Sequence, residues 1–342
     1  MRHIAYRLRH AGIRKVQARG SVLRGFRRAL LILTLLTLCA ELKADPQTNV
    51  PLSIVSPLGR TMQLKFHDEF DAVPDKDGCP YIDRTKWQTT FWQGSGERTL
   101  LSNLEAQYYT DKDYTGRGEA GLKPALNPFS FEKPGILTIS AAKAPKEVWP
   151  NFWMNDQRCF TSGLLISDGR FTFKYGYIEG RFKLPASRGA WPAFWLLSDE
   201  PSLGGPAKAH EWPPEIDIFE FMGHWTNKFD STLITTKGRS DRVNDWTLRY
   251  HQAGFDISKD FHSWGCEWSA QEVVFVFDGK IWARGKTPPS MRRSMYILIN
   301  LAVGGKWYSE EMSKTSTPCK PWEVDESSMP WKLECDYVRV YQ

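Results

Sequence analysis

The stretch Glu-Ile-Asp-Ile-Phe-Glu, residues 215–220, decides how the rest of the chain is interpreted, because it places three carboxylates within six residues. Side chains alternate between the two faces of a β-strand, so Glu215 and Asp217 share one face while the two isoleucines point into a core. Glu220 has the opposite parity and would fall on the apolar face, where an unpaired carboxylate is costly. We therefore predict a β-bulge near Phe219 that turns Glu220 toward the face of Glu215.

Two carboxyl groups on one open face are the arrangement that glycoside hydrolysis requires. In the retaining reaction one carboxylate attacks the anomeric carbon and the other protonates the leaving oxygen, with the two groups about 5–5.5 Å apart. Asp217 would hydrogen-bond the nucleophile and help to keep the pair at different pKa values. The alternative interpretation of the pattern alone is an acidic, solvated edge of a sheet.

The charge of the chain is concentrated in its first 44 residues. They hold ten of the 45 Lys and Arg residues and one of the 39 acidic residues, which leaves 35 basic and 38 acidic residues in the remainder. The formal net charge of +6 therefore describes the leader, and the slightly acidic remainder argues against nucleic acid as the partner.

The apolar run Ala29–Ala40 follows the basic segment and is too short for a comfortable transmembrane span. It fits the apolar region of a secretory signal, with cleavage after Ala40 or Ala44. We expect residues 1–44 to be a signal peptide, the protein to be secreted or periplasmic, and no stable membrane association to remain after cleavage; an uncleaved anchor is the alternative. An oxidising compartment permits disulfides, but the odd number of remaining cysteines leaves at least one unpaired, and their connectivity stays open: Cys79, Cys159, Cys266, Cys319 and Cys335.

Short apolar runs alternate with turn residues from Gln63 onward, and helical periodicity is scarce, so the pattern predicts an all-β sandwich or barrel. We interpret residues 45–62 as an N-terminal arm or linker, residues 63–342 as one domain, and Gly116–Gly135 as a surface insertion. The expected strands are Gly163–Ile166, Arg170–Lys174, Tyr177–Leu184, Ala190–Leu197, Glu215–Phe221, Val273–Phe277, Lys280–Ala283, Tyr296–Val303 and Leu333–Tyr341.

Fifteen Trp residues are more than a core alone usually uses, because each buried indole N–H needs a partner. Trp191 and Trp195 share one face of their expected strand and would stack on sugar rings, although a wholly buried strand fits the same pattern. Asn300 interrupts an apolar run and would hydrogen-bond either a sugar hydroxyl or a neighbouring loop. Glu179 and Arg181 share a strand face, where they would form an ion pair beside the cleft or a plain surface pair.

Five segments that follow one another along the chain together resemble glycoside hydrolase family 16. The resemblance covers about Gln63 to Gln342 and implies a concanavalin-like β-jelly-roll of two curved antiparallel sheets, with the substrate groove on the concave face. It also implies retaining endo-hydrolysis of β-glycans, as in the laminarinase-like and exopolysaccharide-degrading members. The segments are Tyr177–Arg181, Trp191–Trp195, Glu215–Glu220, Asn300–Gly305 followed by Trp307, and Asp336–Tyr341.

The resemblance assigns roles to individual positions. It implies that Glu215 is the nucleophile, Glu220 the acid/base and Asp217 the assisting carboxylate. It further implies a sugar platform at Trp191, with Trp195 supporting the nucleophile side of the groove. In addition, Asn103 and Glu105 resemble a substrate-side loop, and Asp336 resembles a ligand of a structural Ca²⁺. Many relatives carry a His near Ile234, which this chain lacks, so the contacts on the leaving-group side are not defined by the resemblance.

The sequence therefore predicts an endo-β-glycanase that acts on β-1,3- or mixed-linked glucan or on a bacterial exopolysaccharide. The chemistry of two carboxyls requires no cofactor, and we expect a monomer whose partner is the polysaccharide. A carbohydrate-binding protein on the same scaffold, a transglycosylase, and a hydrolase of agar or carrageenan are the alternatives. The sequence fixes neither the sugar and its linkage nor the number of subsites.

Overall fold

The computed structural model describes residues 50–91, 98–114, 126–146, 159–198, 214–234 and 246–342. The chain divides into two compact units, residues 1–43 and 44–342, and everything described here belongs to the second. The predicted signal peptide and its cleavage sites lie outside the described residues, as do residues 116–125 of the insertion predicted at 116–135, whose remainder contains the strand Phe129–Lys133. Within those described ranges, no helix is both long enough and apolar enough to span a membrane.

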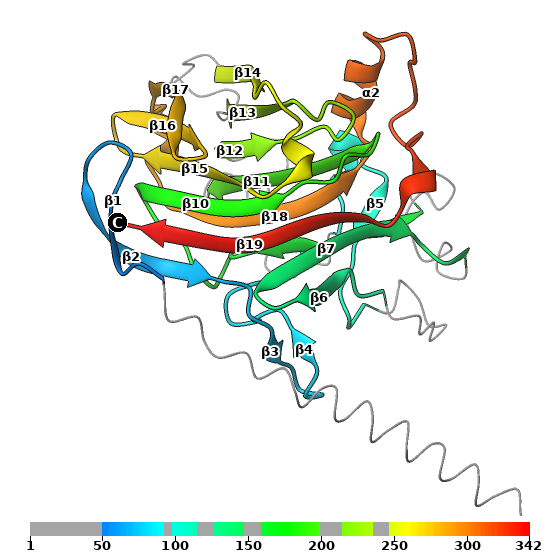
Figure 1. Ribbon diagram of the computed structural model, residues 1–342, viewed down its shortest axis with the longest axis horizontal. Helices are drawn as coiled ribbons and strands as arrows, with labels where there is room; N and C mark the ends of the chain where they lie inside the picture. The colour runs from blue at the N-terminus through cyan, green and yellow to red at the C-terminus, as the bar shows by residue number, and fades with distance from the viewer. Residues whose placement is uncertain (1–49, 92–97, 115–125, 147–158, 199–213, 235–245) are drawn as a thin grey trace, which may run out of the picture. The chain divides into compact units, whose positions relative to one another are not determined.

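Two sheets account for nearly all the regular structure, which confirms the predicted all-β class (Figure 1). In the described ranges the larger sheet has eleven strands, and β19, drawn in red, lies between β10 and β7. Its main path is β17 (Lys280–Lys286), β16 (Glu272–Phe277), β15 (His262–Trp268), β10 (Gly176–Lys183), β19 (Trp331–Tyr341), β7 (Ile136–Lys143), β8 (Phe160–Ser162) and β5 (Gln107–Tyr109). Beside this path, β2 (Thr61–Asp68) pairs with β19, β1 (Ser53–Val55) with β2, and β6 (Phe129–Lys133) with β7.

The smaller sheet carries the acidic stretch on one of its inner strands. In the described residues its order is β14 (Trp246–Gln252), β13 (Lys228–Ile234), β12 (Glu215–Glu220), β11 (Ala190–Ser198), β18 (Met295–Val303) and β9 (Leu164–Ile166). Apolar side chains from both sheets form one buried cluster, to which β12 contributes Ile216, Ile218 and Phe219. Its opposite face is therefore the one available to a substrate. The hairpin β3 (Val73–Pro74) and β4 (Pro80–Tyr81) and the short helix α2 (Lys306–Met312) complete the labelled elements.

The register of β12 confirms the predicted bulge. Glu220 pairs with Ala193 and Phe219 with Phe194, but the next pair joins Asp217 to Trp195, so Ile218 is an extra residue. On the other side of β12 the register shifts in the same interval, between Asp217 and Glu220. Two consecutive side chains, those of Ile218 and Phe219, consequently enter the core, and Glu220 returns to the face of Asp217.

A bulge leaves a backbone group without its ladder partner, and a buried carbonyl without a hydrogen bond is costly. Ser231 on β13 supplies the missing partner, because its hydroxyl donates to the carbonyl oxygen of Ile218 at 2.6 Å. Ser231 is fully buried, between Phe229 and Leu233 on the same strand face, where a small polar residue would otherwise have no evident use. The bulge is therefore supported by a specific side chain of the neighbouring strand.

Most of the expected strands are present within one or two residues of their predicted bounds, but two segments differ from expectation. The predicted strand Arg170–Lys174 is a turn followed by a single bridge between Phe173 and Met295, since Ser167 caps the turn through its hydroxyl and backbone. The predicted arm at 45–62 carries β1 and the first residues of β2. Cys159, Cys266 and Cys335 are buried and form no disulfide.

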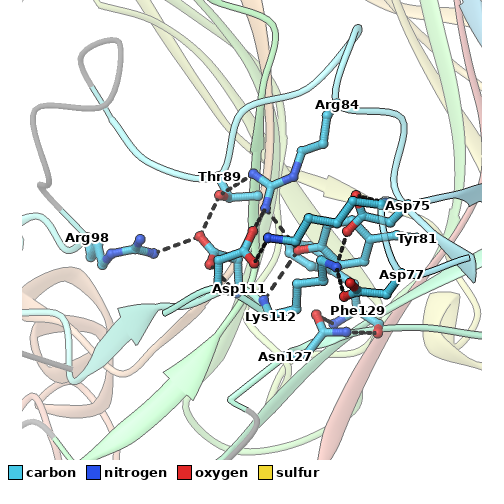
Figure 2. A network of polar contacts seen from close by, with 12 residues as sticks. Asp75, Asp77, Tyr81, Arg84, Thr89, Arg98, Asp111, Lys112, Asn127 and Phe129 are labelled. Carbon is cyan, nitrogen blue, oxygen red and sulfur yellow. Dashed lines mark hydrogen bonds and ion pairs between the residues drawn. The ribbon is translucent and has the colours of Figure 1, made fainter. Parts of the chain in front are cut away.

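A network of charged side chains holds the loops that lead to β5 (Figure 2). Lys112 forms ion pairs with Asp75 and Asp77 of the loop between β3 and β4. Nearby, Asp111 accepts hydrogen bonds from Thr89 at 2.8 Å and from Arg98 at 3.1 Å, and Figure 2 shows both converging on one carboxyl group. The guanidinium of Arg98 also donates to the backbone oxygen of Tyr109, at 2.9 Å. These bonds fix the start of the segment that contains Asn103 and Glu105.

The support of the bulge can be tested by removing one hydroxyl. Ser231→Ala should lower the free energy of unfolding by about 1–3 kcal/mol, because it leaves the buried Ile218 carbonyl without a partner. Ser309→Ala is the matched control, since the Ser309 hydroxyl also donates to a backbone carbonyl but in an exposed position. Denaturant unfolding monitored by tryptophan fluorescence measures both; equal, small losses would show that the bulge does not depend on Ser231.

Candidate active site

Three carboxyl groups line up along the open face of the smaller sheet. In the register of β11, Leu197 is opposite Glu215, Trp195 is opposite Asp217, and Ala193 is opposite Glu220. Glu215 and Asp217 are buried, while Glu220 is half-buried at the end of the strand. The bulge thus brings together the two acids that the sequence placed out of phase.

Asp217 is the most enclosed of the three acids. Burial raises its pKa well above the usual range of an aspartic acid, and the negative charges of Glu215 and Glu220 raise it further. A hydrogen bond between the side chains of Asp217 and Glu215 acts in the same direction. The raised pKa favours the protonated form of Asp217, which would donate that hydrogen bond to Glu215, as the predicted assisting role requires.

Trp191 and Trp195 lie on this same face, but most of each ring is covered: 9% of the surface of Trp191 and 6% of that of Trp195 are exposed. Both indoles have partners for their N–H groups. The Trp191 Nε1 donates to Glu220 Oε1 at 3.2 Å, and the Trp195 Nε1 donates to Asn300 Oδ1 at 2.8 Å. Each Trp is thus positioned to fix a polar group of the site, and the sugar contacts predicted for them stay a prediction.

Asn300 and Glu105 belong to a chain of buried hydrogen bonds that begins at Trp195. The Asn300 amide donates to the Tyr109 hydroxyl at 2.9 Å, and that hydroxyl lies 3.5 Å from Glu105 Oε2. Glu105 also accepts from Asn103, at 3.1 Å. Burial raises the pKa of Glu105, while the hydrogen bonds from Gln107 and Asn103 oppose that rise. The side chain of Asn300 therefore has protein partners on two strands, Trp195 of β11 and Tyr109 of β5, and its predicted bond to a sugar hydroxyl stays a prediction.

The loop of Asn103 lies close to the Trp191 ring. Gly305 separates them: a Cβ there would lie 2.9 Å from the Trp191 ring and 3.3 Å from the Asn103 carbonyl oxygen. Glycine at this position, with φ of 105°, is what allows the approach. The structure accordingly brings four predicted substrate-side residues to the same face as the acids: Trp191, Trp195, Asn103 and Asn300.

A small hollow next to Glu220 adds residues that the sequence analysis did not single out. Besides Glu220 it is lined by Met222, Trp225, Lys228, Phe229, Asp230 and Trp307. Trp307 packs edge-on against Trp191, with ring centroids 5.2 Å apart, and the Lys228 ammonium lies 3.2 Å from the Trp225 ring centroid. The pairing of β12 with β13 places Asp230 directly opposite Glu220. A predicted register for these two strands would therefore have identified Asp230.

Glu179 and Arg181 do not lie at this site, so the prediction that they contribute to substrate binding as an ion pair beside the cleft is wrong. They lie on β10 of the larger sheet, and alternate with Ile178 and Phe182, which enter the core, so they point away from the smaller sheet. The expected ion pair between them is also replaced by other contacts. Glu179 accepts hydrogen bonds from the hydroxyls of Tyr177 and Tyr337, at 2.6 and 2.8 Å.

Arg181 instead pairs with Asp336, which bears on the predicted structural Ca²⁺. A guanidinium on the Asp336 carboxyl competes with a cation for the same oxygens. Across the described part of the chain, no group of three or more His, Cys, Asp or Glu side chains could hold a metal ion. The structural Ca²⁺ at Asp336 stays a prediction, and a cation bound there would have to replace the Arg181 guanidinium on this carboxyl group.

Solved structures with the same fold include β-glucanases. The endo-β-1,3-glucanase from Pyrococcus furiosus is 25% identical, with a TM-score of 0.60 over 86% of this chain and 98% of that one. A non-specific endo-β-1,3(4)-glucanase, SCLam, is also 25% identical with a TM-score of 0.60, over 82% of this chain and 91% of that one. This likeness confirms the jelly-roll sandwich predicted from the sequence.

Curated relatives show the same similarity. Endo-1,3-1,4-β-glycanase ExsH of Rhizobium meliloti (strain 1021) is 34% identical over 241 residues, 70% of this chain and 46% of that protein. The chain thus spans about half the length of the first relatives it matches. The β-glucanase of Rhodothermus marinus is 28% identical over 92% of this chain and 94% of its own length. The family model for glycosyl hydrolases family 16 matches residues 129–317, more than half of the 342 residues, and the chain therefore belongs to that family.

Proposed function

We propose that this protein is an endo-β-glycanase that hydrolyses its substrate with retention of configuration, using Glu215 as nucleophile and Glu220 as acid/base. The observation that carries the proposal is the bulge in β12, which puts Glu220 on the same face as Glu215. The raised pKa of Asp217 is the second support, because it favours a neutral carboxyl group between the two acids rather than a third charge.

In the proposed first step the Glu215 carboxylate forms a bond to the anomeric carbon while the bond to the leaving oxygen breaks. Glu220 gives its proton to that oxygen, so the leaving sugar departs as an alcohol and Glu220 becomes a carboxylate. In the second step Glu220 takes a proton from water, whose oxygen attacks the anomeric carbon and releases Glu215. Asp217 would donate its hydrogen bond to Glu215 most strongly when Glu215 is ionised, before attack and after release.

The substrate we propose is a β-glucan with 1,3 or mixed 1,3 and 1,4 linkages, or a bacterial exopolysaccharide that contains them. The names of the relatives support this choice, since they describe an endo-1,3-1,4-β-glycanase, a β-glucanase and an endo-β-1,3-glucanase. The indoles of Trp191, Trp225 and Trp307 around Glu220 support a polysaccharide, because flat aromatic faces suit pyranose rings. Secretion or export to the periplasm is proposed from the basic and apolar leader at residues 1–44.

Replacing either catalytic acid by its amide tests the proposed roles. Glu215→Gln and Glu220→Gln should each lower kcat on laminarin or mixed-linked glucan by at least about 100-fold, because each removes a group needed in the transition state. Binding of the same glucan, measured by affinity electrophoresis, should persist. Hydrolysis at the wild-type rate by either variant would refute the assignment.

The reaction itself can be tested by the anomeric configuration of the first product. A panel of β-glucans, agar and carrageenan should identify a polysaccharide that the protein cleaves internally, with a rapid fall in chain length. ¹H NMR of the early reaction should then show the β-anomer forming before mutarotation, as retention requires. Binding without any reducing-end release would favour the carbohydrate-binding alternative, and longer products would favour a transglycosylase.

The raised pKa of Asp217 leads to a prediction on stability. A carboxyl group whose pKa is higher in the folded protein contributes stability that is complete below its unfolded pKa, near 3.9, and is lost as the pH rises. Asp217→Asn keeps a hydrogen-bond donor for Glu215 and removes this dependence. The variant should therefore gain stability relative to the wild type between pH 4 and pH 8, as measured by urea unfolding at both values. A constant difference between the two proteins would contradict the protonated state.

A further inference from the structure

We propose that Asp230 is a positioning residue for the reaction, which acts through Glu220 by making the ionised form of that acid unfavourable. The inference rests on the proposed function, because Asp230 affects the reaction only if Glu220 is the acid/base that must keep its proton. It goes beyond the Glu215, Asp217 and Glu220 constellation, to which the sequence analysis did not add Asp230.

The geometry follows from the same bulge that aligns the three acids. Past the extra residue, Glu220 is directly opposite Asp230 on β13, whereas Asp217 is opposite Thr232. Side chains that are directly opposite in an antiparallel pair have Cβ atoms about 4.5–5.5 Å apart and point to the same face. Both side chains also line the one hollow at this end of the strand. Without the bulge, Glu220 would face the core and could not meet Asp230 on this side.

Burial gives the charge of Asp230 its influence. Only 4% of its surface is exposed, so water screens its carboxyl group weakly. Its charge also reaches the other acids, because Asp230 is among the groups that raise the pKa of Asp217. A like charge beside a carboxyl group disfavours its ionisation and raises its pKa.

Lys228 is a cation close to Asp230, and its charge favours the ionised form of that carboxyl group. It lies two residues earlier on β13 and therefore on the same strand face. Burial lowers the pKa of the Lys228 ammonium, and the attraction to Asp230 opposes that fall. The Trp225 ring, 3.2 Å from the ammonium, holds Lys228 in place. Asp230 thus has a cation on one side and the proton-donating acid on the other.

Other charged and polar groups around Glu220 act on it from several elements. On its own strand Glu215 contributes negative charge, whereas the raised pKa of Asp217 favours the neutral form of that group. The Trp191 N–H from β11 donates a hydrogen bond to Glu220 that favours the carboxylate. From α2, Glu311 acts on Lys228, and so does Lys314, which follows the helix. Burial lowers the pKa of His224, in the turn after β12, to about 4, so this His is neutral at neutral pH. Asp230 is therefore the acid that a neighbouring strand contributes directly opposite Glu220.

The direct test is a titration of Glu220 itself. Protein labelled with ¹³C at the Glu carboxyl carbons is titrated by NMR, and the Glu220 resonance is assigned by its absence in Glu220→Gln. In Asp230→Asn the pKa of Glu220 should fall by about 1 unit, because a neighbouring negative charge is removed. Asp230→Glu, which keeps the charge, and Asp260→Asn, which removes an exposed carboxylate elsewhere, should leave it near the wild-type value.

The same variants give a second readout in the reaction. Glu220 must be protonated to donate, so activity is lost as the pH rises through its pKa, and the alkaline limb of kcat/KM in Asp230→Asn should move to lower pH. Asp230→Ser serves as a second neutral variant should the amide fold poorly. An unchanged or raised Glu220 pKa in folded neutral variants overturns the inference, whereas a wild type inactive on every β-glycan overturns the proposed function and leaves the NMR result to decide this point.

Discussion

One extra residue in β12 is the constraint on which the site depends. Ile218 has no paired residue on β11, and two successive side chains of β12, those of Ile218 and Phe219, therefore enter the core. The gain is that the carboxyl groups of Glu215 and Glu220 share a face that an unbroken strand would deny them. The cost is a carbonyl group without a ladder partner, which the hydroxyl of Ser231 satisfies. The proposed catalytic arrangement thus depends on a backbone irregularity and on one buried side chain of the next strand.

The electrostatics of the site follow from that alignment. Four carboxyl groups lie on one face of two paired strands: those of Glu215, Asp217, Glu220 and Asp230. Because this face is largely buried, water screens the repulsion between them only weakly. Their mutual repulsion disfavours the ionisation of all four, and the pKa of Asp217, the most buried, is raised by burial and by the charges of the other three. In the proposed mechanism this repulsion separates the role of the attacking carboxylate from that of the proton donor beside it.

The sequence predicted the features that depend on local periodicity and failed where distant strands decide. The parity of Glu220 within six residues was enough to require a bulge, and the alternation around Glu179 and Arg181 correctly grouped them on one face. Alternation does not reveal to which sheet the strand belongs or whether that face points toward the other sheet. Here Glu179 and Arg181 lie on the outer face of the larger sheet. The partners of Asn300 could not be foreseen either, because Tyr109 is 191 residues away along the chain. Asp230 could have been identified from the register of β12 and β13, but it belongs to no sequence motif that would single it out.

The position of a bound glucan relative to the two outer acids would test the central claim most directly. A crystal structure of Glu215→Gln with a β-glucan oligosaccharide across the site should show the anomeric carbon about 3–3.5 Å from the side chain of residue 215. The oxygen of the glycosidic bond at that carbon should lie within hydrogen-bonding distance of Glu220, on the same face of the sheet. An oligosaccharide bound with that oxygen out of reach of Glu220, or with the two side chains on opposite faces of β12, would contradict the account.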